Sequence, residues 1–153
     1  KVIMKPGILT PIFLSLSLHN SFSQEISNPE TLYDPTIHGY SHVAVVPANS
    51  VQVFVAGQGG HTKEGVISHD FRKQVQQSFK NLELALQSKG LSLKNIVKLT
   101  TLVVDYDEKK HQILIEESAK IWTDKKFPVN TLIPVPRLAL TEMQIEIDAT
   151  AVK

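Results

Sequence analysis

Residues 127–152 read FPVNTLIPVPRLALTEMQIEIDATAV, and this stretch decides the fold. From residue 145 to residue 151, isoleucine and alanine alternate with charged or polar residues, so a strand over residues 143–152 is expected to bury one face. Residues 130–140 are also strand-like, but they contain two prolines. Because proline has no N–H to donate to a neighbouring strand, we expect this second strand at an edge of a sheet.

Upstream of this stretch, the hydrophobic period changes to that of a helix. Large apolar residues recur at spacings of four, four, three and four, at Phe71, Val75, Phe79, Leu82 and Leu86. This pattern predicts one buried face of an amphipathic helix. Ser68 or Asp70 is expected to cap its start, and Gly90 is placed to end it.

Further elements follow from the same reasoning. Residues 43–46 and 51–56 are apolar runs separated by a turn signal, which indicates a hairpin. Residues 96–104 are rich in β-branched side chains and predict another strand. A second helix is expected after Asp107, with a face made of Ile115, Ala119 and Trp122.

The order β-β-α-β-α-β-β predicts an α+β fold, in which one mixed sheet carries two helices on one face. The other face of the sheet would then be open. Phe54 and Leu132 are candidates to point toward that open face. Self-association is the commonest way to cover such a surface.

Composition limits the classes of function. The chain has 153 residues, 42% of them hydrophobic, with 16 basic and 15 acidic groups. This length fits one domain, and the balanced charge gives no basic face for nucleic acid. The absence of cysteine excludes disulfides and thiolate chemistry. The six histidines show no metal-ligand spacing, so no metal is expected.

The N-terminal segment differs from the remainder of the chain. Residues 1–24 contain Lys5, an apolar stretch over 8–18 and small residues before a cut at Gln24, which predicts a secretory signal peptide. The alternative is a disordered extension. Residues 25–39 would form an arm and residues 40–153 the domain. A functional signal implies a periplasmic or secreted protein with no membrane attachment after cleavage, whereas an extension implies a cytoplasmic one.

Three stretches resemble the RidA/YjgF-type reactive-intermediate deaminases: GYSHVAVVPANSVQVFVAGQ (39–58), KNLELALQSKGLSLKNIVKLTTLVVDYDE (80–108) and residues 127–152. Gln74, Asn81, Gly90 and the closing IEIDATAV stand where the family has Gln, Asn, Gly and IEIEAIAV. The resemblance covers residues 39–153. It implies a chorismate-mutase-like fold, a homotrimer with clefts between subunits, and hydrolysis of enamine or imine acids to oxo acids and ammonia without a cofactor.

The resemblance also implies roles for individual residues. In active members, an arginine opens the penultimate strand and holds the substrate carboxylate, a glutamate on the last strand positions water, and a tyrosine lines the cleft. Glu146 matches the glutamate and Tyr40 the tyrosine, but Asn130 takes the place of the arginine. Asparagine keeps hydrogen-bond donors but loses the positive charge of a bidentate arginine–carboxylate contact. Arg137 would point to the opposite face unless a bulge turned the strand.

Two hypotheses follow from this comparison. In the first, a trimer binds a small metabolite in clefts lined by Tyr40, Asn130, Leu132 and the catalytic Glu146, and a backbone amide near Gly57–Gln58 helps to hold the substrate. The lost arginine favours a substrate that is not a simple anionic imino acid. In the second, the trimer is a non-catalytic or chaperone-like binder. Cleavage of nucleic acid suits neither the charge balance nor the lack of a basic stripe.

Overall fold

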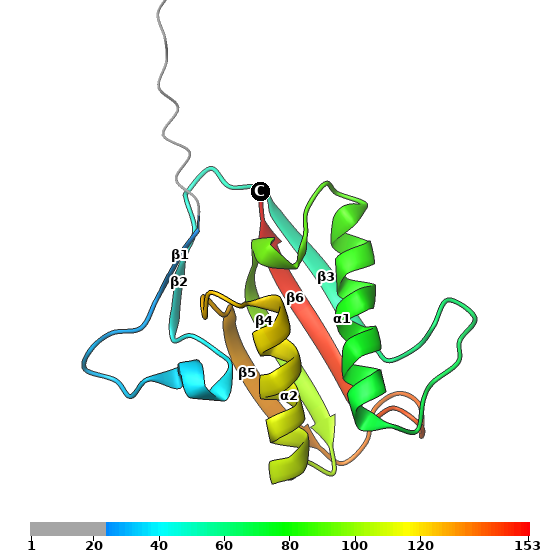
Figure 1. Ribbon diagram of the computed structural model, residues 1–153. Helices are drawn as coiled ribbons and strands as arrows, with labels where there is room; N and C mark the ends of the chain where they lie inside the picture. The colour runs from blue at the N-terminus through cyan, green and yellow to red at the C-terminus, as the bar shows by residue number, and fades with distance from the viewer. Residues whose placement is uncertain (1–23) are drawn as a thin grey trace, which may run out of the picture.

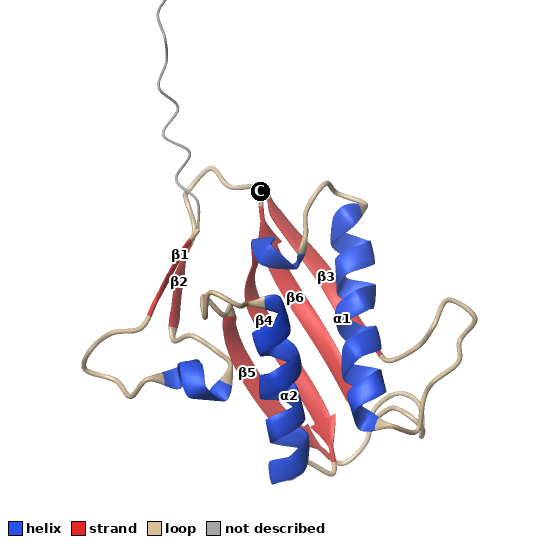
Figure 2. Cartoon of the chain, viewed as in Figure 1, coloured by secondary structure: helices blue, strands red, loops and turns tan. Residues whose placement is uncertain are grey.

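In the computed structural model, residues 24–153 are described, and within them four long strands form one mixed sheet (Figures 1 and 2). Two helices cover one face of this sheet. The elements are β3 (Gln52–Gly59), α1 (Phe71–Gln87), β4 (Ile96–Val104), α2 (Glu108–Ile121), β5 (Val129–Val135) and β6 (Ile145–Val152). This arrangement confirms the predicted α+β fold. The predicted signal peptide lies outside the described residues and stays a prediction.

The sheet has the strand order β3-β6-β4-β5, so β3 and β5 are its two edges. β6 pairs antiparallel with both β3 and β4, and β4 pairs parallel with β5 across the α2 crossover. The register places Leu99 opposite Asn130 and Leu102 opposite Glu146. These pairs locate the two residues of most interest on strands separated by β4.

The predicted hairpin between residues 43–46 and 51–56 is wrong. β2 (Val43–Val45) pairs antiparallel with β1 (Glu25–Ser27) from the arm, and the two form a separate small sheet. A turn closed by the Ser50 N–H and the Pro47 carbonyl, 3.0 Å apart, separates β2 from β3. The arm supplies the backbone partners of β2, and only the three-dimensional path of the chain brings them together.

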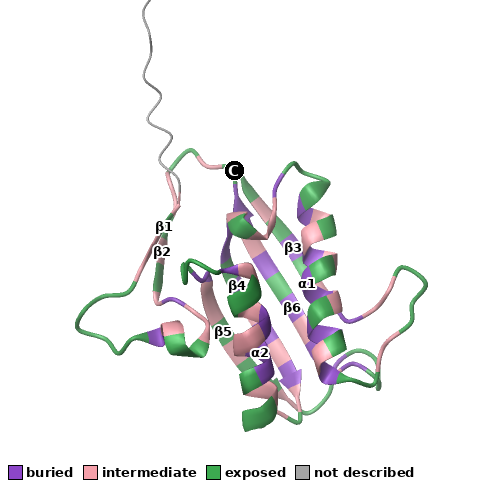
Figure 3. Ribbon diagram, viewed as in Figure 1, coloured by how far each residue is buried: buried purple, intermediate pink, exposed green. Residues whose placement is uncertain are grey.

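The core lies between the sheet and the two helices (Figure 3). All five apolar residues that predict α1 are buried, and burial of each large side chain contributes about 1.5–3 kcal/mol before entropy is counted. Asp70 caps the helix by accepting a hydrogen bond from the Lys73 N–H at 2.9 Å. The predicted face of α2 is wrong at Ala119, which is exposed. Its buried positions are instead Ile113, Leu114 and Glu117.

The opposite face of the sheet has no helix on it, as predicted. Phe54 is 74% exposed there, next to Thr150 of β6 in the register. Leu132 was expected on this face too, and that expectation is wrong. Leu132 pairs with Thr101, which is 2% exposed, and packs against the core on the helix side.

β5 is an edge strand, as its prolines predict. In the sheet, β5 pairs with β4 alone. An edge strand of this kind tolerates Pro134, because no strand on its outer side needs an N–H from it. The register with β4 runs without a bulge from Val129 to Val135. Arg137 lies beyond the strand and is exposed, with its Nε donating to the Leu138 carbonyl at 3.4 Å.

Candidate functional site

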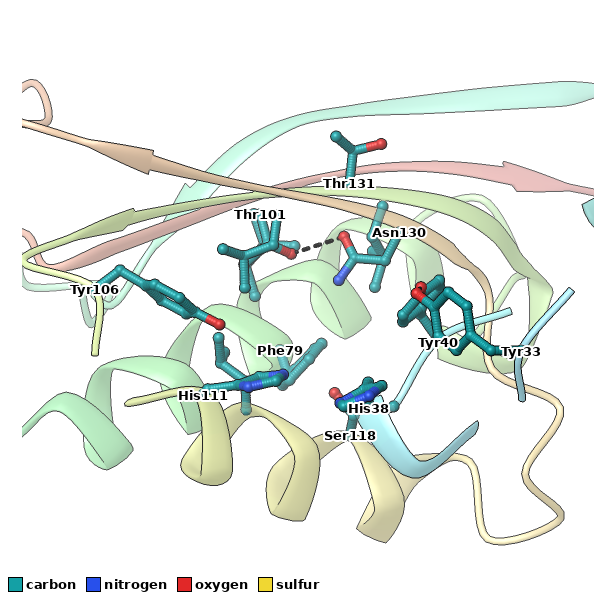
Figure 4. A pocket seen from close by; sticks show the side chains of 15 residues that line it. Tyr33, His38, Tyr40, Phe79, Thr101, Tyr106, His111, Ser118, Asn130 and Thr131 are labelled. Carbon is teal, nitrogen blue, oxygen red and sulfur yellow. Dashed lines mark hydrogen bonds between the residues drawn. The ribbon is translucent and has the colours of Figure 1, made fainter. Parts of the chain in front are cut away.

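Two hollows lie at the two edges of the sheet. The first, here called the α2 cavity, has a volume of about 480 Å³ and lies between α2 and the β5 side of the sheet (Figure 4). The second, here called the β3 groove, has a volume of about 960 Å³ and lies between β3, α1 and the loop before β6. Both volumes are in the range of small-molecule sites.

Asn130 faces the α2 cavity from β5. The buried Thr101 hydroxyl donates to Asn130 Oδ1 at 3.1 Å. This contact leaves the Asn130 amide nitrogen pointing into the cavity, as Figure 4 shows. Asn130 is therefore a fixed, neutral hydrogen-bond donor in the wall of this cavity.

Tyr40 reaches the same cavity from the start of the domain, directly after the arm. A short 3₁₀ helix, η1 (Pro35–His38), is capped by Asp34, which accepts from the Thr36 N–H at 2.9 Å. The chain then turns at Gly39, whose φ of 74° lies in the left-handed region that favours glycine. The turn directs His38 toward α2 and Tyr40 toward β5, where the Tyr40 hydroxyl is hydrogen-bonded to that of Tyr33.

Two imidazole rings form the α2 side of the cavity. The rings of His38 and His111 are nearly parallel, at 12°, with their centroids 5.6 Å apart. The Tyr106 ring lies 5.9 Å from that of His111. Burial, and to a lesser degree the charge of His38, lowers the pKa of His111, and burial raises the pKa of Tyr106. Both shifts favour the uncharged form of the side chain.

Glu146 lies in the other hollow, the β3 groove. The buried Ile145 and Ile147 flank it and point to the core, so its side chain leaves the sheet on the other face. A Cβ atom on Gly57 would overlap with Glu146 Oε1 and lie 2.7 Å from its Cδ. The carboxylate therefore occupies the space that this glycine leaves, where the register between β3 and β6 shifts.

Gln58 follows Gly57 in the same irregular part of β3. Its side-chain Nε2 donates to the Ala56 carbonyl at 2.9 Å, so its amide group folds back on the backbone. Asn81 of α1 fixes the end of β3, because its Nδ2 donates to the Gly59 carbonyl at 3.0 Å and to the His61 carbonyl at 2.8 Å. These contacts hold the wall of the groove beside Glu146.

The predicted site residues thus divide into two groups. Tyr40, Asn130 and Leu132 line the α2 cavity, whereas Gly57, Gln58 and Glu146 line the β3 groove. Because β3 and β5 are opposite edges of the sheet, one chain does not bring both groups into one pocket. Arg137 lines neither hollow, so within one chain it does not join either group of predicted site residues.

Sequence reasoning missed several residues of the α2 cavity. His38 was not among them, because its position two residues before Tyr40 already marks it as a candidate to line a pocket, and it does line this cavity. His111, Leu114 and Ser118 also line the cavity, and their spacing of three and four marks one face of α2. A face that mixes a histidine, a leucine and a serine shows neither the apolar stripe of a core-facing helix nor a cluster of charge, so periodicity alone does not mark it as a site.

Within residues 24–153, no group of three or more histidine and acidic side chains is placed to hold a metal ion. In the same part of the chain, none of the helices has the length and apolar character needed to cross a bilayer.

The mixed sheet, its two helices and the hollows at both edges define an α+β protein of the chorismate-mutase-like class. Residues 31–153 match the family model described as "Endoribonuclease L-PSP". The chain therefore belongs to this RidA/YjgF-type family.

Individual relatives agree with this assignment. A "RutC family protein" of Aquifex aeolicus is 35% identical over 103 residues, which are 66% of this chain and 80% of the relative. A "2-iminobutanoate/2-iminopropanoate deaminase" of Salmonella typhimurium is 30% identical over 91 residues, 60% of this chain and 70% of the relative. The crystal structure of the Rid family protein YyfB from Yersinia pestis superimposes with a TM-score of 0.79 at 29% identity, and covers 86% of this chain and 99% of its own.

Proposed function

We propose that the chain forms a homotrimer that binds a small metabolite in clefts between subunits. The observation that carries this proposal is the division of the site residues between the two edges of the sheet. In a closed ring of identical subunits the contacts are heterologous, so one edge of each subunit meets the other edge of the next. The α2 cavity of one subunit and Glu146 of its neighbour would then face a common cleft.

The chemistry that fits this cleft is hydrolysis of an imine to an oxo compound and ammonia. Glu146 would accept a proton from water as the water oxygen bonds to the imine carbon, while the C=N electron pair moves onto nitrogen. Glu146 returns this proton to the nitrogen, the new hydroxyl group gives up a second proton that also passes to the nitrogen, and the C–N bond breaks to release ammonia as the C=O bond forms. An enamine would first take a proton on carbon to become the imine. The deaminase of Salmonella typhimurium among the relatives supports this reaction class.

A second candidate is a non-catalytic binder of the same fold. It is favoured by Asn130, which supplies a donor but no positive charge where the resemblance implies an arginine. A neutral amide donor lacks both the charge and the bidentate geometry with which arginine holds a carboxylate. In such a protein Glu146 would be dispensable for binding.

The test is hydrolysis of freshly generated imines, both 2-imino acids and their uncharged 2-imino amides, by the purified chain and its Glu146→Gln variant. We expect the substitution to slow the reaction by about 100-fold or more, the range for loss of a general base. Asp148→Asn is the matched control, because Asp148 lies two residues on along the same strand and is exposed. A parent chain without activity, or equal losses in both variants, would favour the non-catalytic binder.

Mixing of variants tests whether the site is shared between subunits. Ser118→Trp fills the α2 cavity, and Glu146→Gln removes the base at the other edge. Equal amounts of the two inactive variants are unfolded and refolded together. Half of the chains then carry an intact α2 cavity and the other half an intact Glu146. If the site is shared, random assembly brings the two together in about a quarter of the sites, so about a quarter of the parent activity returns. A site contained within one chain would regain none.

A further inference from the structure

The α2 cavity carries no Asp, Glu, Lys or Arg among the side chains that line it. The cations nearby on the helices are engaged elsewhere. Lys110 Nζ donates to the Val104 carbonyl at 2.7 Å and lies over the Phe71 ring. Arg72 makes ion pairs of 2.7 Å with Glu116 and Glu117. An anionic ligand in this cavity would lose its hydration without gaining a counter-charge, which is costly.

The cavity nevertheless presents several polar atoms that make no hydrogen bond within the described part of the chain. They are the Asn130 amide nitrogen, the Tyr106 hydroxyl, the Ser118 hydroxyl and the ring nitrogens of His38 and His111. In Figure 4 the Asn130 nitrogen and the Tyr106 hydroxyl both point toward the space between the sheet and α2. Groups of this kind require water or a ligand to satisfy them.

The shape of the walls adds a second constraint. The parallel imidazoles of His38 and His111 lie on the α2 side, opposite Asn130 and Thr101 on the sheet. Phe79 and Leu99 add apolar surface to the lining. A flat ring can lie in offset contact with such aromatic walls at centroid distances of 4.5–7 Å.

We infer that the α2 cavity binds an uncharged planar molecule that carries a carbonyl or amide group. The Asn130 amide donates to the carbonyl oxygen of the ligand, the Tyr106 hydroxyl bonds to its polar end, and its ring lies against the imidazoles. This inference rests on the proposed function, because the α2 cavity forms half of the proposed cleft. An uncharged planar carbonyl or amide compound would then be the substrate class of that cleft.

Three small compounds of one shape and different charge test this inference: benzamide, benzoate and benzamidinium. Their binding to the purified chain is measured at pH 7.5 by saturation-transfer NMR and titration. We expect benzamide to bind about tenfold or more tightly than either ion, since neither ion finds a partner for its charge. Equal affinities, tighter binding of benzoate, or no binding of any of the three would overturn the inference.

Substitutions assign the binding to this cavity. Asn130→Arg places a cation in the cavity and is expected to reverse the order, so that benzoate binds more tightly than benzamide. Gln112→Arg adds the same charge on the exposed side of α2 and should leave the order unchanged. Tyr106→Phe removes only a hydroxyl and should weaken benzamide binding several-fold with an unaltered thermal melt. An unchanged order in Asn130→Arg would contradict the assignment to this cavity.

The outcome separates this inference from the proposed hydrolysis. Selective benzamide binding without any imine hydrolysis would leave the inference standing and support the non-catalytic binder. Rapid hydrolysis of anionic imino acids together with a preference for benzoate would support the hydrolase and refute the inference.

Discussion

Gln74 joins three segments of the chain around the base of α1, and its replacement gives a sharp test of the fold. Its side chain is fully buried. Its Nε2 donates to the carbonyls of Ser68 at 2.7 Å and Glu142 at 2.8 Å, and its Oε1 accepts from the Gln144 N–H at 2.8 Å. The amide thus connects the loop before α1 with the loop before β6, the strand that carries Glu146.

Methionine at this position keeps the length of the side chain but makes none of these hydrogen bonds. Two carbonyls and one N–H lose their partner, and each such bond contributes about 1 kcal/mol net. We therefore expect Gln74→Met to lower the free energy of unfolding by about 3 kcal/mol. For a domain of this size that loss corresponds to a fall in Tm of about 6–12 °C.

Urea denaturation followed by tryptophan fluorescence measures this effect directly. Trp122 is the single tryptophan of the chain and is 3% exposed, so its emission reports unfolding of the core. Gln87→Met is the matched control on the same helix, because Gln87 is exposed and its side chain bonds only to that of Glu83. A loss below about 1 kcal/mol in Gln74→Met, or one no larger than in the control, would refute the reasoning.

Three further predictions rest on local geometry. Gly60→Ala should lower the free energy of unfolding by about 1–3 kcal/mol in the same assay, because the new Cβ would lie 2.6 Å from Gln74 Cα. An unchanged free energy of unfolding would mean that the backbone around residue 60 shifts to make room at no cost. The pKa of His111, lowered by burial and by His38, means that the unfolded chain takes up the proton first, so the contribution of this group to stability should be constant above about pH 6.5 and fall below it. His111→Phe should flatten that slope between pH 7.5 and pH 5.5, and a slope that persists would place its origin elsewhere. Phe54→Lys puts a charge on the open face of the sheet and should reduce the mass seen in sedimentation, whereas an unchanged oligomer would mean that this face is not buried between subunits.

Local patterns of the sequence determined the long elements. The spacing of Phe71, Val75 and Phe79 predicts α1, and the structure buries all three. Alternation predicts β6, whose isoleucines are fully buried. These predictions succeed because the period of a helix or a strand is a property of consecutive residues. The same alternation correctly turns Asn130 and Leu132 to one face of β5, where both line the α2 cavity.

Strand partners were harder to predict, because pairing joins residues that are distant in the sequence. The run over residues 43–46 looked like half of a hairpin, yet β2 pairs with β1 from the arm. β3 pairs instead with β6 at the far end of the chain. Periodicity indicates that a segment is a strand, but it carries no information about which other strand forms hydrogen bonds with its backbone.

The sequence by itself determined the residue types of the candidate site: a glutamate on the last strand, a tyrosine after the arm, and an asparagine where the resemblance implies an arginine. Only the tertiary structure decided where they lie. The strand order places Glu146 in the groove at the β3 edge and Asn130 in the cavity at the β5 edge. The stacking of His38 on His111 likewise joins the arm to α2. Such contacts depend on how the elements pack together, and a one-dimensional pattern does not contain that information.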